Sequence, residues 1–160
     1  MEEKITFSFG ENWRAYLETI SEESIRSVRE DIENWLGAEA GRGKKILDIG
    51  CGSGIHSLIF HQLGAKELVS FDADPISVES TTILREKAGS PSSWKVMKGS
   101  VLDKSFIANN IGGAIFDIVY SWGVLHHTGS MWRAIENSSS LVKKGGLYWI
   151  ALYRKGPRYE

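Results

Sequence analysis

Residues 46–54 read Ile-Leu-Asp-Ile-Gly-Cys-Gly-Ser-Gly, an apolar strand pattern that runs directly into three glycines at alternate positions. Glycines at this point leave bare backbone N–H groups beside a ligand at the carboxyl end of a parallel strand, where a helix N-terminus also faces outward. A side chain would block that approach, and glycine also tolerates a positive φ. The stretch therefore predicts a strand–turn–helix unit that binds a ligand at its turn.

The spacing of the glycines separates two classes of cofactor. The dinucleotide fingerprint G-x-G-x-x-G needs its third glycine at position 55, which is Ile55, whereas the third glycine here is Gly54. A G-x-G-x-G loop preceded by Asp48 resembles motif I of the class I S-adenosylmethionine-dependent methyltransferases. This family is the leading interpretation. The alternatives are a nicotinamide dehydrogenase, against which Ile55 argues, and a glycine-rich turn that binds nothing.

Size and composition favour a single soluble domain. The chain has 160 residues, 24% of them charged, and a net charge of −1, so no basic excess points to nucleic acid. One cysteine, Cys51, excludes an internal disulfide and is compatible with a reducing compartment. The N-terminus has no apolar signal region, and no apolar run is long enough to cross a bilayer. We therefore expect a cytoplasmic protein that binds neither nucleic acid nor a membrane.

The hydrophobic pattern predicts an α/β fold. Two amphipathic helical segments precede the glycine loop, and Ser21 and Gly37 are the expected start and end signals of the second. Beyond the loop, strands and helices alternate, which indicates a doubly wound, mostly parallel, Rossmann-like sheet with helices on both faces. The expected strands are 45–49, 67–71, 94–98, 116–120 and 147–153, and the expected helices between them are 55–63, 75–88 and 131–142.

The resemblance adds a strand order and a domain description to this pattern. It implies the order 3-2-1-4-5 within one S-adenosylmethionine-binding domain that covers residues 1–160. Residues 1–43 would form an N-terminal helical cap and residues 44–160 the α/β core.

The last predicted strand, 147–153, is apolar on both faces, which is typical of a strand inside a sheet. The family normally adds a helix and an antiparallel pair of strands beyond this strand, but only seven residues follow it here. We therefore expect an open strand edge. Either the core is truncated after strand five or a second copy covers the edge, and we favour truncation with a homodimer as its consequence.

The resemblance assigns most of a cofactor site to the first two strands. Gly50, Gly52 and Gly54 would contact the methionine part of S-adenosylmethionine, with Cys51 as a small residue that fits between them. Asp48 would contact the methionine amino group, directly or through water.

Asp72 closes the second strand, where a carboxylate can accept hydrogen bonds from both ribose hydroxyls. Ala73 would lie against the adenine. The alternative for Asp72 is a loop aspartate, since Asp74 already serves as the next helix cap.

Further contacts are implied after strands three and four. Ser100 and Val101 would read the adenine, and Asp103 is best explained as the cap of a short helix. The main-chain carbonyls near Ser121 would face the methionine amine. Trp122 would either form a wall of the transfer site or pack in the core. The aromatic N-terminal segment that contains Trp13 would fold over the cofactor or dock on the sheet as a helix.

His126 and His127 are the candidate catalytic bases, because a histidine near the methyl donor can deprotonate an attacking nucleophile. A locally hydrogen-bonded pair at a helix start is the alternative. We predict no metal site, since His56 and His61 are five residues apart and do not share a helix face.

The segment 116–129 resembles motif IV of small-molecule methyltransferases of the ubiquinone and menaquinone biosynthesis type. The expected reaction is methyl transfer to an oxygen, nitrogen or carbon nucleophile of a small-molecule acceptor. One alternative is a non-catalytic module of the same fold that binds S-adenosylmethionine or S-adenosylhomocysteine. A nucleic-acid modifier ranks lower, because no Asn-Pro-Pro-Tyr-type stretch follows strand four.

Overall fold

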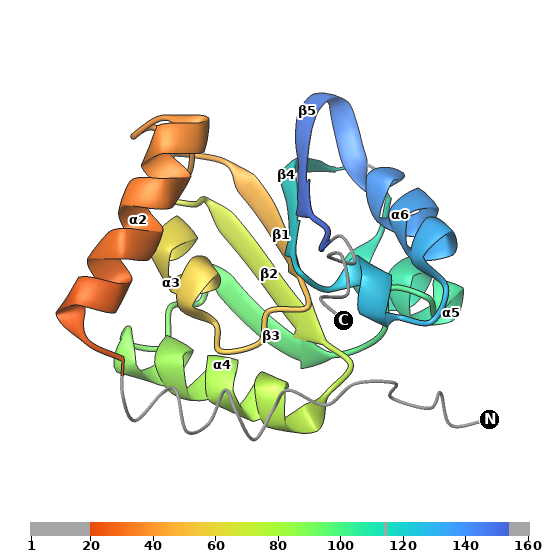
Figure 1. Ribbon diagram of the computed structural model, residues 1–160, viewed down its shortest axis with the longest axis horizontal. Coiled ribbons are helices and arrows are strands. Elements are labelled where there is room, and N and C mark those ends of the chain that lie inside the picture. Colours follow the sequence, from red (N-terminus) through yellow and green to blue (C-terminus); the bar gives the residue numbers. More distant parts are fainter. Residues whose placement is uncertain (1–19, 114, 154–160) are drawn as a thin grey trace, which may run out of the picture.

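The structure is a computed structural model that describes residues 20–113 and 115–153 (Figure 1). Its strands are β1 (Lys45–Ile49), β2 (Glu67–Asp72), β3 (Trp94–Lys98), β4 (Phe116–Trp122) and β5 (Val142–Ala151). Its α-helices are α2 (Glu22–Leu36), α3 (Ile55–Gln62), α4 (Pro75–Lys87), α5 (Lys104–Phe106) and α6 (Met131–Ser139). A π-helical turn (Ile107–Ile111) follows α5, and a 3₁₀ turn (Leu125–His127) follows β4.

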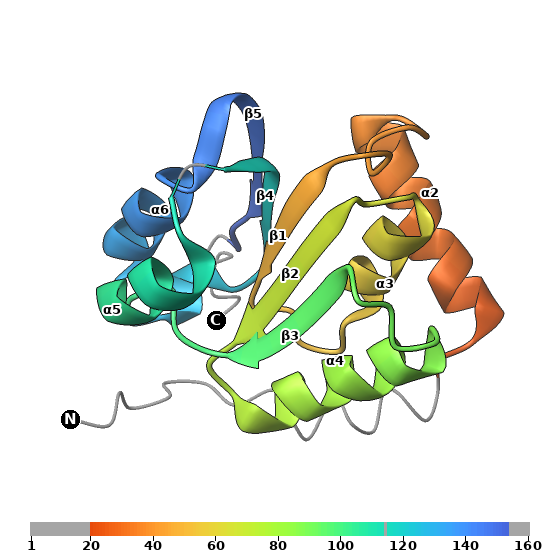
Figure 2. The same ribbon diagram turned by 180° about the vertical axis from the view of Figure 1, so that it is seen from behind.

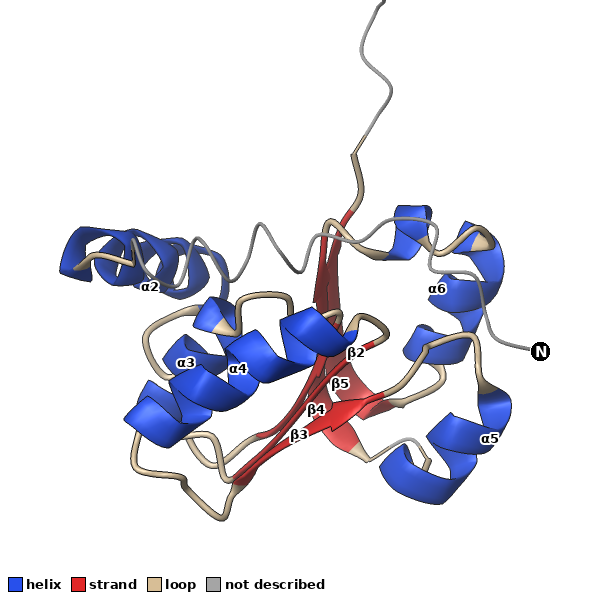
Figure 3. Ribbon diagram, turned by 90° about the horizontal axis from the view of Figure 1, so that it is seen from below, coloured by secondary structure: helices blue, strands red, loops and turns tan. Residues whose placement is uncertain are grey.

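The five strands form one parallel sheet in the order β3-β2-β1-β4-β5, so the predicted fold class and strand order are confirmed. Helices α2, α3 and α4 cover one face of the sheet, and α5 and α6 cover the other (Figure 3). The chain reverses its direction of winding between β1 and β4. In open sheets of this kind, ligands bind outside the carboxyl ends of the strands at that point.

Apolar side chains on the two faces of the sheet form two cores, one under each helix layer. Ile46 and Tyr120 lie in the core beneath α2 and α3, whereas Leu47 and Val119 lie in the core beneath α6. Successive residues of a strand point to opposite faces, so neighbours in the sequence enter different cores. Both faces of β1 and β4 are therefore buried, and the strands hold the following loops in fixed positions.

Three predicted helix caps are confirmed. The hydroxyl of Ser21 accepts a hydrogen bond from the Ser24 N–H, and the Asp74 carboxylate accepts one from the Ile76 N–H. The Asp103 carboxylate accepts the Phe106 N–H at the start of α5.

The predicted bounds of α6 and β5 differ most from the structure. Helix α6 ends at Ser139 and not at residue 142, because hydroxyls of the serine run 138–140 compete for the helical carbonyls. Ser138 donates to the carbonyl of Ala134, and Ser140 donates to that of Asn137. Strand β5 begins at Val142, before the predicted start, and ends at Ala151.

The early start of β5 comes with an irregularity in its pairing. Phe116 is opposite Val142 and Ile118 is opposite Leu147, so β5 carries extra residues between these two pairs. Gly145, with φ +76°, lies within this bulge. Regular pairing with β4 begins at Leu147, the predicted first residue.

Strand β3 forms one edge of the sheet, beside α4 (Figure 2), and β5 forms the other. Among the described residues, β5 pairs with β4 alone. Leu147 is 41% exposed and Tyr153, just beyond the strand, is 63% exposed. The described residues include no helix with the length and apolar character that a membrane span requires.

Candidate cofactor-binding site

The glycine loop joins β1 to α3 with its three glycines at positive φ: +73° at Gly50, +54° at Gly52 and +82° at Gly54. A Cβ atom on Gly50 would lie 2.5 Å from the Val124 side chain, and one on Gly54 would lie 2.9 Å from the Thr81 Cα. Both distances are too short for real contacts. The loop therefore fits between the segment after β4 and helix α4 only as bare backbone.

Asp72 ties this loop to the end of β2. One carboxylate oxygen accepts the Gly52 N–H at 3.0 Å, and the other accepts the Asp74 N–H at 2.9 Å. Burial raises the pKa of Asp72, and these backbone donors oppose the rise. Each oxygen keeps a second lone pair, so the carboxylate can still accept hydroxyl groups of a ligand. Ala73, between the two aspartates, is exposed.

Asp48 lies beneath the loop and is only 2% exposed. Its carboxylate accepts a hydrogen bond of 2.5 Å from the Ser57 hydroxyl on α3. Burial raises the pKa of Asp48 to about 7, with a further increase from the charge of Asp72, while the Ser57 bond lowers it. Ser57 is in turn 2.7 Å from the hydroxyl of Ser70, which accepts the indole N–H of Trp94 at 2.9 Å.

Cys51 is a buried thiol within the loop. Thr81 on α4 donates its hydroxyl to the Cys51 sulfur at 3.2 Å and to the Gly52 carbonyl at 3.1 Å. Burial raises the pKa of Cys51 well above its ordinary value. The thiol is therefore neutral and acts as a small packed side chain.

The end of β4 lies beside the glycine loop. Ser121 is fully buried and donates its hydroxyl to the Ile49 carbonyl at 2.9 Å, which joins β4 to β1. Trp122 is 42% exposed, and its ring lies 6.2 Å from that of His56 and 5.8 Å from that of Trp149. Trp122 therefore packs on the aromatic groups beneath α2 and still presents part of its surface at the carboxyl edge.

The loop after β3 approaches from the other face of the sheet. The Ser100 hydroxyl accepts the Leu102 N–H at 3.1 Å. Val101 is buried, and its carbonyl accepts the side-chain amide of Asn137 on α6 at 2.9 Å. Asn137 thus fixes the predicted adenine loop. No motif identifies it, and its only sequence signal is an amide on a mostly apolar helix face.

His126 and His127 lie in the 3₁₀ turn that directly follows Val124, with their rings 4.0 Å apart. Neither ring nitrogen of His126 has a hydrogen-bond partner among the described residues, and its ring is 5.0 Å from that of Tyr153. Burial and the neighbouring His127 lower the pKa of His126, which keeps the imidazole in the neutral form that a general base needs. Trp13 lies outside the described residues.

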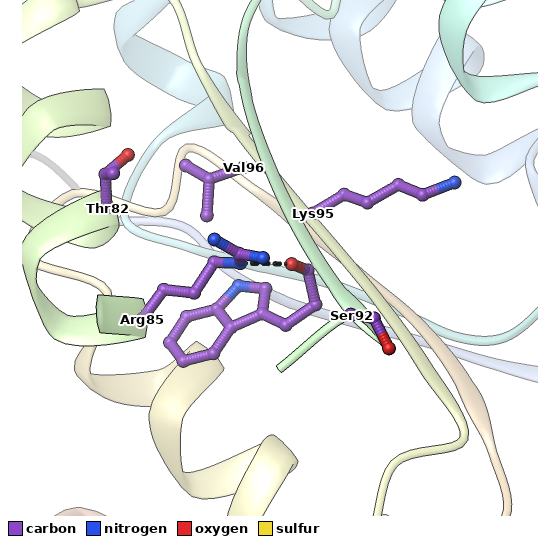
Figure 4. Close-up of a pocket in the computed structure, with 6 residues that line it drawn as sticks. Thr82, Arg85, Ser92, Lys95 and Val96 are labelled. Carbon is purple, nitrogen blue, oxygen red and sulfur yellow. Dashed lines mark hydrogen bonds between the residues drawn. The ribbon is translucent and has the colours of Figure 1, made fainter. Parts of the chain in front are cut away.

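A separate hollow of about 280 Å³ lies between α4 and β3, where it is lined by Thr82, Arg85, Ser92, Trp94, Lys95 and Val96 (Figure 4). The Arg85 guanidinium closes one side and donates to the backbone carbonyls of Trp94 and Pro91. Since Trp94 begins β3, the hollow is at the amino end of the strand. The glycine loop is at the carboxyl edge, so this hollow is not the predicted cofactor site.

The fold and the loop together define a class I, Rossmann-like nucleotide-binding domain. A protein family described as "Methyltransferase domain" matches residues 16–156. The chain therefore belongs to this family and is of the class I S-adenosylmethionine-dependent methyltransferase type.

Relatives and solved structures agree with this assignment. A ubiquinone biosynthesis O-methyltransferase of Methylobacterium sp. is 28% identical over 77% of this chain and 46% of its own length. A tRNA U34 carboxymethyltransferase of Methylococcus capsulatus is 31% identical over 65% of this chain and 30% of its own. The chain thus spans less than half the length of these relatives. The crystal structure of a putative S-adenosylmethionine-dependent methyltransferase from Methanococcus maripaludis has the same fold, with a TM-score of 0.72 and 17% identity over 91% of this chain and 65% of that one.

The cofactor of this class is S-adenosylmethionine, and the geometry of the site fits it. Close approach to the loop backbone needs the absence of side chains, which the contacts at Gly50 and Gly54 enforce. The ribose of the cofactor would donate its hydroxyl hydrogens to a carboxylate at the end of β2. Asp72 is held there by two backbone donors. The roles of the individual residues remain predictions.

Proposed function

We propose that this chain carries out S-adenosylmethionine-dependent methyl transfer to a small-molecule acceptor. The observation that supports the proposal best is the glycine loop, whose three residues at positive φ place backbone without side chains at the end of β1, beside Asp72. Packing against Val124 and Thr81 already excludes side chains at Gly50 and Gly54, so the case for a ligand rests on the G-x-G-x-G spacing together with the adjacent Asp72.

The proposed roles follow the arrangement of the elements. Gly50, Gly52 and Gly54 hold the methionine part, Asp72 accepts the ribose hydroxyls, and the loop at Ser100 and Val101 contacts the adenine. When bound, the cofactor supplies a methyl group on a positively charged sulfur. The chain's task is then mainly to orient it, and orientation in such reactions contributes on the order of 7–11 kcal/mol.

His126 is the better placed of the two candidate bases. Its imidazole is kept neutral by burial and by His127, and the described residues leave both its nitrogens without a partner. A base of this kind contributes about 10²–10⁴-fold to a rate. Loss of His126 should therefore reduce turnover less than loss of the glycine loop.

The class of acceptor rests on the sequence around β4 and on the ubiquinone biosynthesis O-methyltransferase among the relatives. The tRNA-modifying relative gives a nucleic-acid acceptor as an alternative, although the net charge of −1 does not favour it. A non-catalytic binding module is the second alternative.

A calorimetric titration with S-adenosylhomocysteine tests the cofactor site. Gly52→Val should abolish binding, since the branched side chain would occupy the approach to the loop and disfavour the φ of +54°. Gly89→Val is the matched control, because Gly89 also has a positive φ, +88°, and has no atom near its Cβ position. Unchanged affinity in Gly52→Val would refute the proposed site.

Two further measurements separate the alternatives. A thermal-shift comparison of S-adenosylhomocysteine with NAD should show stabilisation by the first compound only. Transfer of a radiolabelled methyl group from the cofactor to ubiquinone-type phenols, to tRNA or to protein would then identify the acceptor class. Binding without transfer to any of them would favour the non-catalytic module.

A homodimer and a cytoplasmic location also remain proposals. Among the described residues β5 pairs with β4 alone, and this edge supports pairing between two copies of the chain. We also propose the domain division at residue 43, because α2 precedes β1 and lies outside the alternating strands and helices of the core.

A further inference from the structure

We propose that Ser57, held in turn by Ser70 and Trp94, is a positioning residue of the cofactor site that fixes the orientation and the charge state of Asp48. The inference rests on the proposed function, because it concerns how the site receives the cofactor's ammonium group. It concerns side chains that no motif of the sequence identified.

The order of the hydrogens in this chain of side chains is fixed by its two ends, the indole of Trp94 and the carboxylate of Asp48. The indole N–H of Trp94 is a donor only, so the hydroxyl oxygen of Ser70 must accept it. The hydrogen of Ser57 goes to the Asp48 carboxylate at 2.5 Å. The remaining contact, 2.7 Å between the two serine oxygens, is therefore made by the Ser70 hydrogen. Every donor points toward Asp48.

Such a directed chain strengthens its last bond. Each hydroxyl that accepts a hydrogen bond becomes a better donor, and the effect increases in a dry interior. Ser57 and Ser70 are 0% exposed, and the chain extends from β3 through β2 and α3 to β1. Trp94 is also fully buried, and its backbone carbonyl is held by Arg85. The donor at Asp48 is thus fixed by groups from four elements.

The hydrogen bond from Ser57 matters because the other groups around Asp48 disfavour its charged form. The Asp72 carboxyl on β2 raises the pKa of Asp48, and the charge of Asp48 in turn raises the pKa values of the Cys51 thiol in the loop and the Tyr120 hydroxyl on β4. All three are neutral or negative, and no cation among the described residues acts on the pKa of Asp48. Ser57 is therefore the group that favours the charged carboxylate before an ammonium arrives.

A buried pair of serine hydroxyls is costly unless it is satisfied, and an apolar pair would pack as well. The directed bonds satisfy both hydroxyls. Near neutral pH, Asp48 is then partly protonated and partly ionised. Binding of a cation favours the ionised form, so the proton is released.

The test compares wild type, Ser57→Ala and Ser80→Ala in calorimetric titrations with S-adenosylhomocysteine between pH 6 and 8.5. Ser80 on α4 is a matched control, since it is a buried serine whose hydroxyl donates only to a helical carbonyl, that of Ile76. Titrations at pH 7 in buffers of different ionisation enthalpy report the protons released on binding. A carbon-13 NMR titration of the Asp48 carboxyl in the free protein reports its ionisation independently of the ligand.

Wild-type affinity should rise with pH, with a midpoint near 7 that follows the pKa of Asp48. In Ser57→Ala the midpoint should move upward by about one pH unit, the size expected for loss of one hydrogen bond to a charged group. Affinity at pH 7 should then fall several-fold and largely recover by pH 8.5, and the fraction of a proton released at pH 7 should increase. Trp94→Phe should shift the midpoint in the same direction by a smaller amount, and Ser80→Ala should match wild type.

Two results would overturn the inference while the proposed function survives. One is an unchanged midpoint in Ser57→Ala, both in calorimetry and in the NMR titration. The other is an equal loss of affinity at every pH, which is the signature of a merely structural role. If wild type binds no S-adenosylhomocysteine at any pH, the proposed function and this inference both fail.

Discussion

Gly50 and Gly89 share a positive φ, but only Gly50 has a side chain beside its Cβ position, that of Val124 at 2.5 Å. Gly89→Ala should lower the free energy of unfolding by about 1 kcal/mol through backbone strain. Gly50→Ala should cost about 2–4 kcal/mol, because the new methyl group also displaces Val124. Urea unfolding measures both values.

A double variant distinguishes this contact from strain alone. Val124→Ala removes the two methyl groups that a Cβ on Gly50 would touch. It should therefore cost less in the Gly50→Ala background than in wild type, with a coupling of roughly 1 kcal/mol. Additive effects would show that Val124 does not set the identity of this residue.

The charged carboxylate of Asp48 lowers the stability of the folded protein near neutral pH, whereas the proposed function needs that charge. Burial raises its pKa from 3.8 to about 7, so in this range the folded protein holds a proton that the unfolded chain has released. The stabilisation that the folded protein gains from holding this proton is fully present below about pH 4, and it is lost as the pH rises through about 7. Asp48→Asn has no such loss. It should therefore be more stable than wild type at pH 8, by up to about 4 kcal/mol, and should bind S-adenosylhomocysteine poorly.

Urea unfolding of Asp48→Asn and wild type at pH 5 and pH 8 checks this sign. The difference in stability should be larger at pH 8, because the extra proton of folded wild type is lost between these values. His56, whose pKa burial lowers to about 4, is common to both proteins and cancels in the comparison. An equal difference at the two pH values would show that Asp48 ionises normally in the folded protein.

The sequence predicts part of the site at this scale. A motif identifies Asp48, Asp72 and the glycines, since their spacing along the chain carries the signal. It does not identify Ser57 or Asn137, whose partners are 13 and 36 residues away along the chain. Ser70 gave one unused signal, a lone hydroxyl in the middle of an otherwise apolar strand.

Among the elements, Asp117 links three strands at the end of the sheet opposite the glycine loop. Its carboxylate accepts the Lys45 N–H at 2.8 Å and pairs with Lys143. Both contacts lower its pKa. Asp117→Ala should lower the free energy of unfolding by about 1–3 kcal/mol, because it leaves a strand N–H without an acceptor.

The same variant should leave affinity for S-adenosylhomocysteine unchanged, since the strands separate Asp117 from the loop. Lys143→Ala is the control for the ion pair. Lys143 is 47% exposed, so its loss should have a smaller effect. Weaker cofactor binding in Asp117→Ala would mean that the two ends of the sheet are coupled.

Element types were predictable, and element ends were less so. Strands β1 and β3 match the predicted residues, because each ends directly before a glycine, Gly50 and Gly99 respectively. The start of β5 differs because its first residues pair with β4 through a bulge, and a bulge depends on the partner strand. The end of α6 depends on where the serine hydroxyls of 138–140 find carbonyls.

For the whole molecule, the strand order followed from the resemblance and not from periodicity. Alternating strands and helices are compatible with several strand orders. Motif I and the spacing of Asp72 from it are typical of a family in which the strand order is 3-2-1-4-5. The open side of β5 stays a prediction of the same kind, and β5 pairs with β4 alone among the described residues. A partner that covers this side is not visible in the pattern of one chain. The exposed apolar residues near the edge are the evidence for it.

That exposure leads to a prediction about association. Leu147 in β5 and Leu152, the residue directly after it, are each 41% exposed, and the outer edge of β5 has no neighbouring strand among the described residues. Two copies related by a twofold axis could pair these edges in an antiparallel manner. Sedimentation velocity should then show a dimer whose fraction rises with concentration. Leu147→Lys and Leu152→Lys should weaken it, because like charges would meet across the axis.

Trp132→Lys is the matched control, since Trp132 is 76% exposed on α6 and the variant adds the same charge away from the strand edge. It should dimerise as wild type does. A chain that stays monomeric at all concentrations would contradict edge pairing, and so would equal loss of dimer in all three variants. If dimers persist in Leu147→Lys and Leu152→Lys but not in Trp132→Lys, the contact lies on the α6 face, and the β5 edge is not the dimer interface.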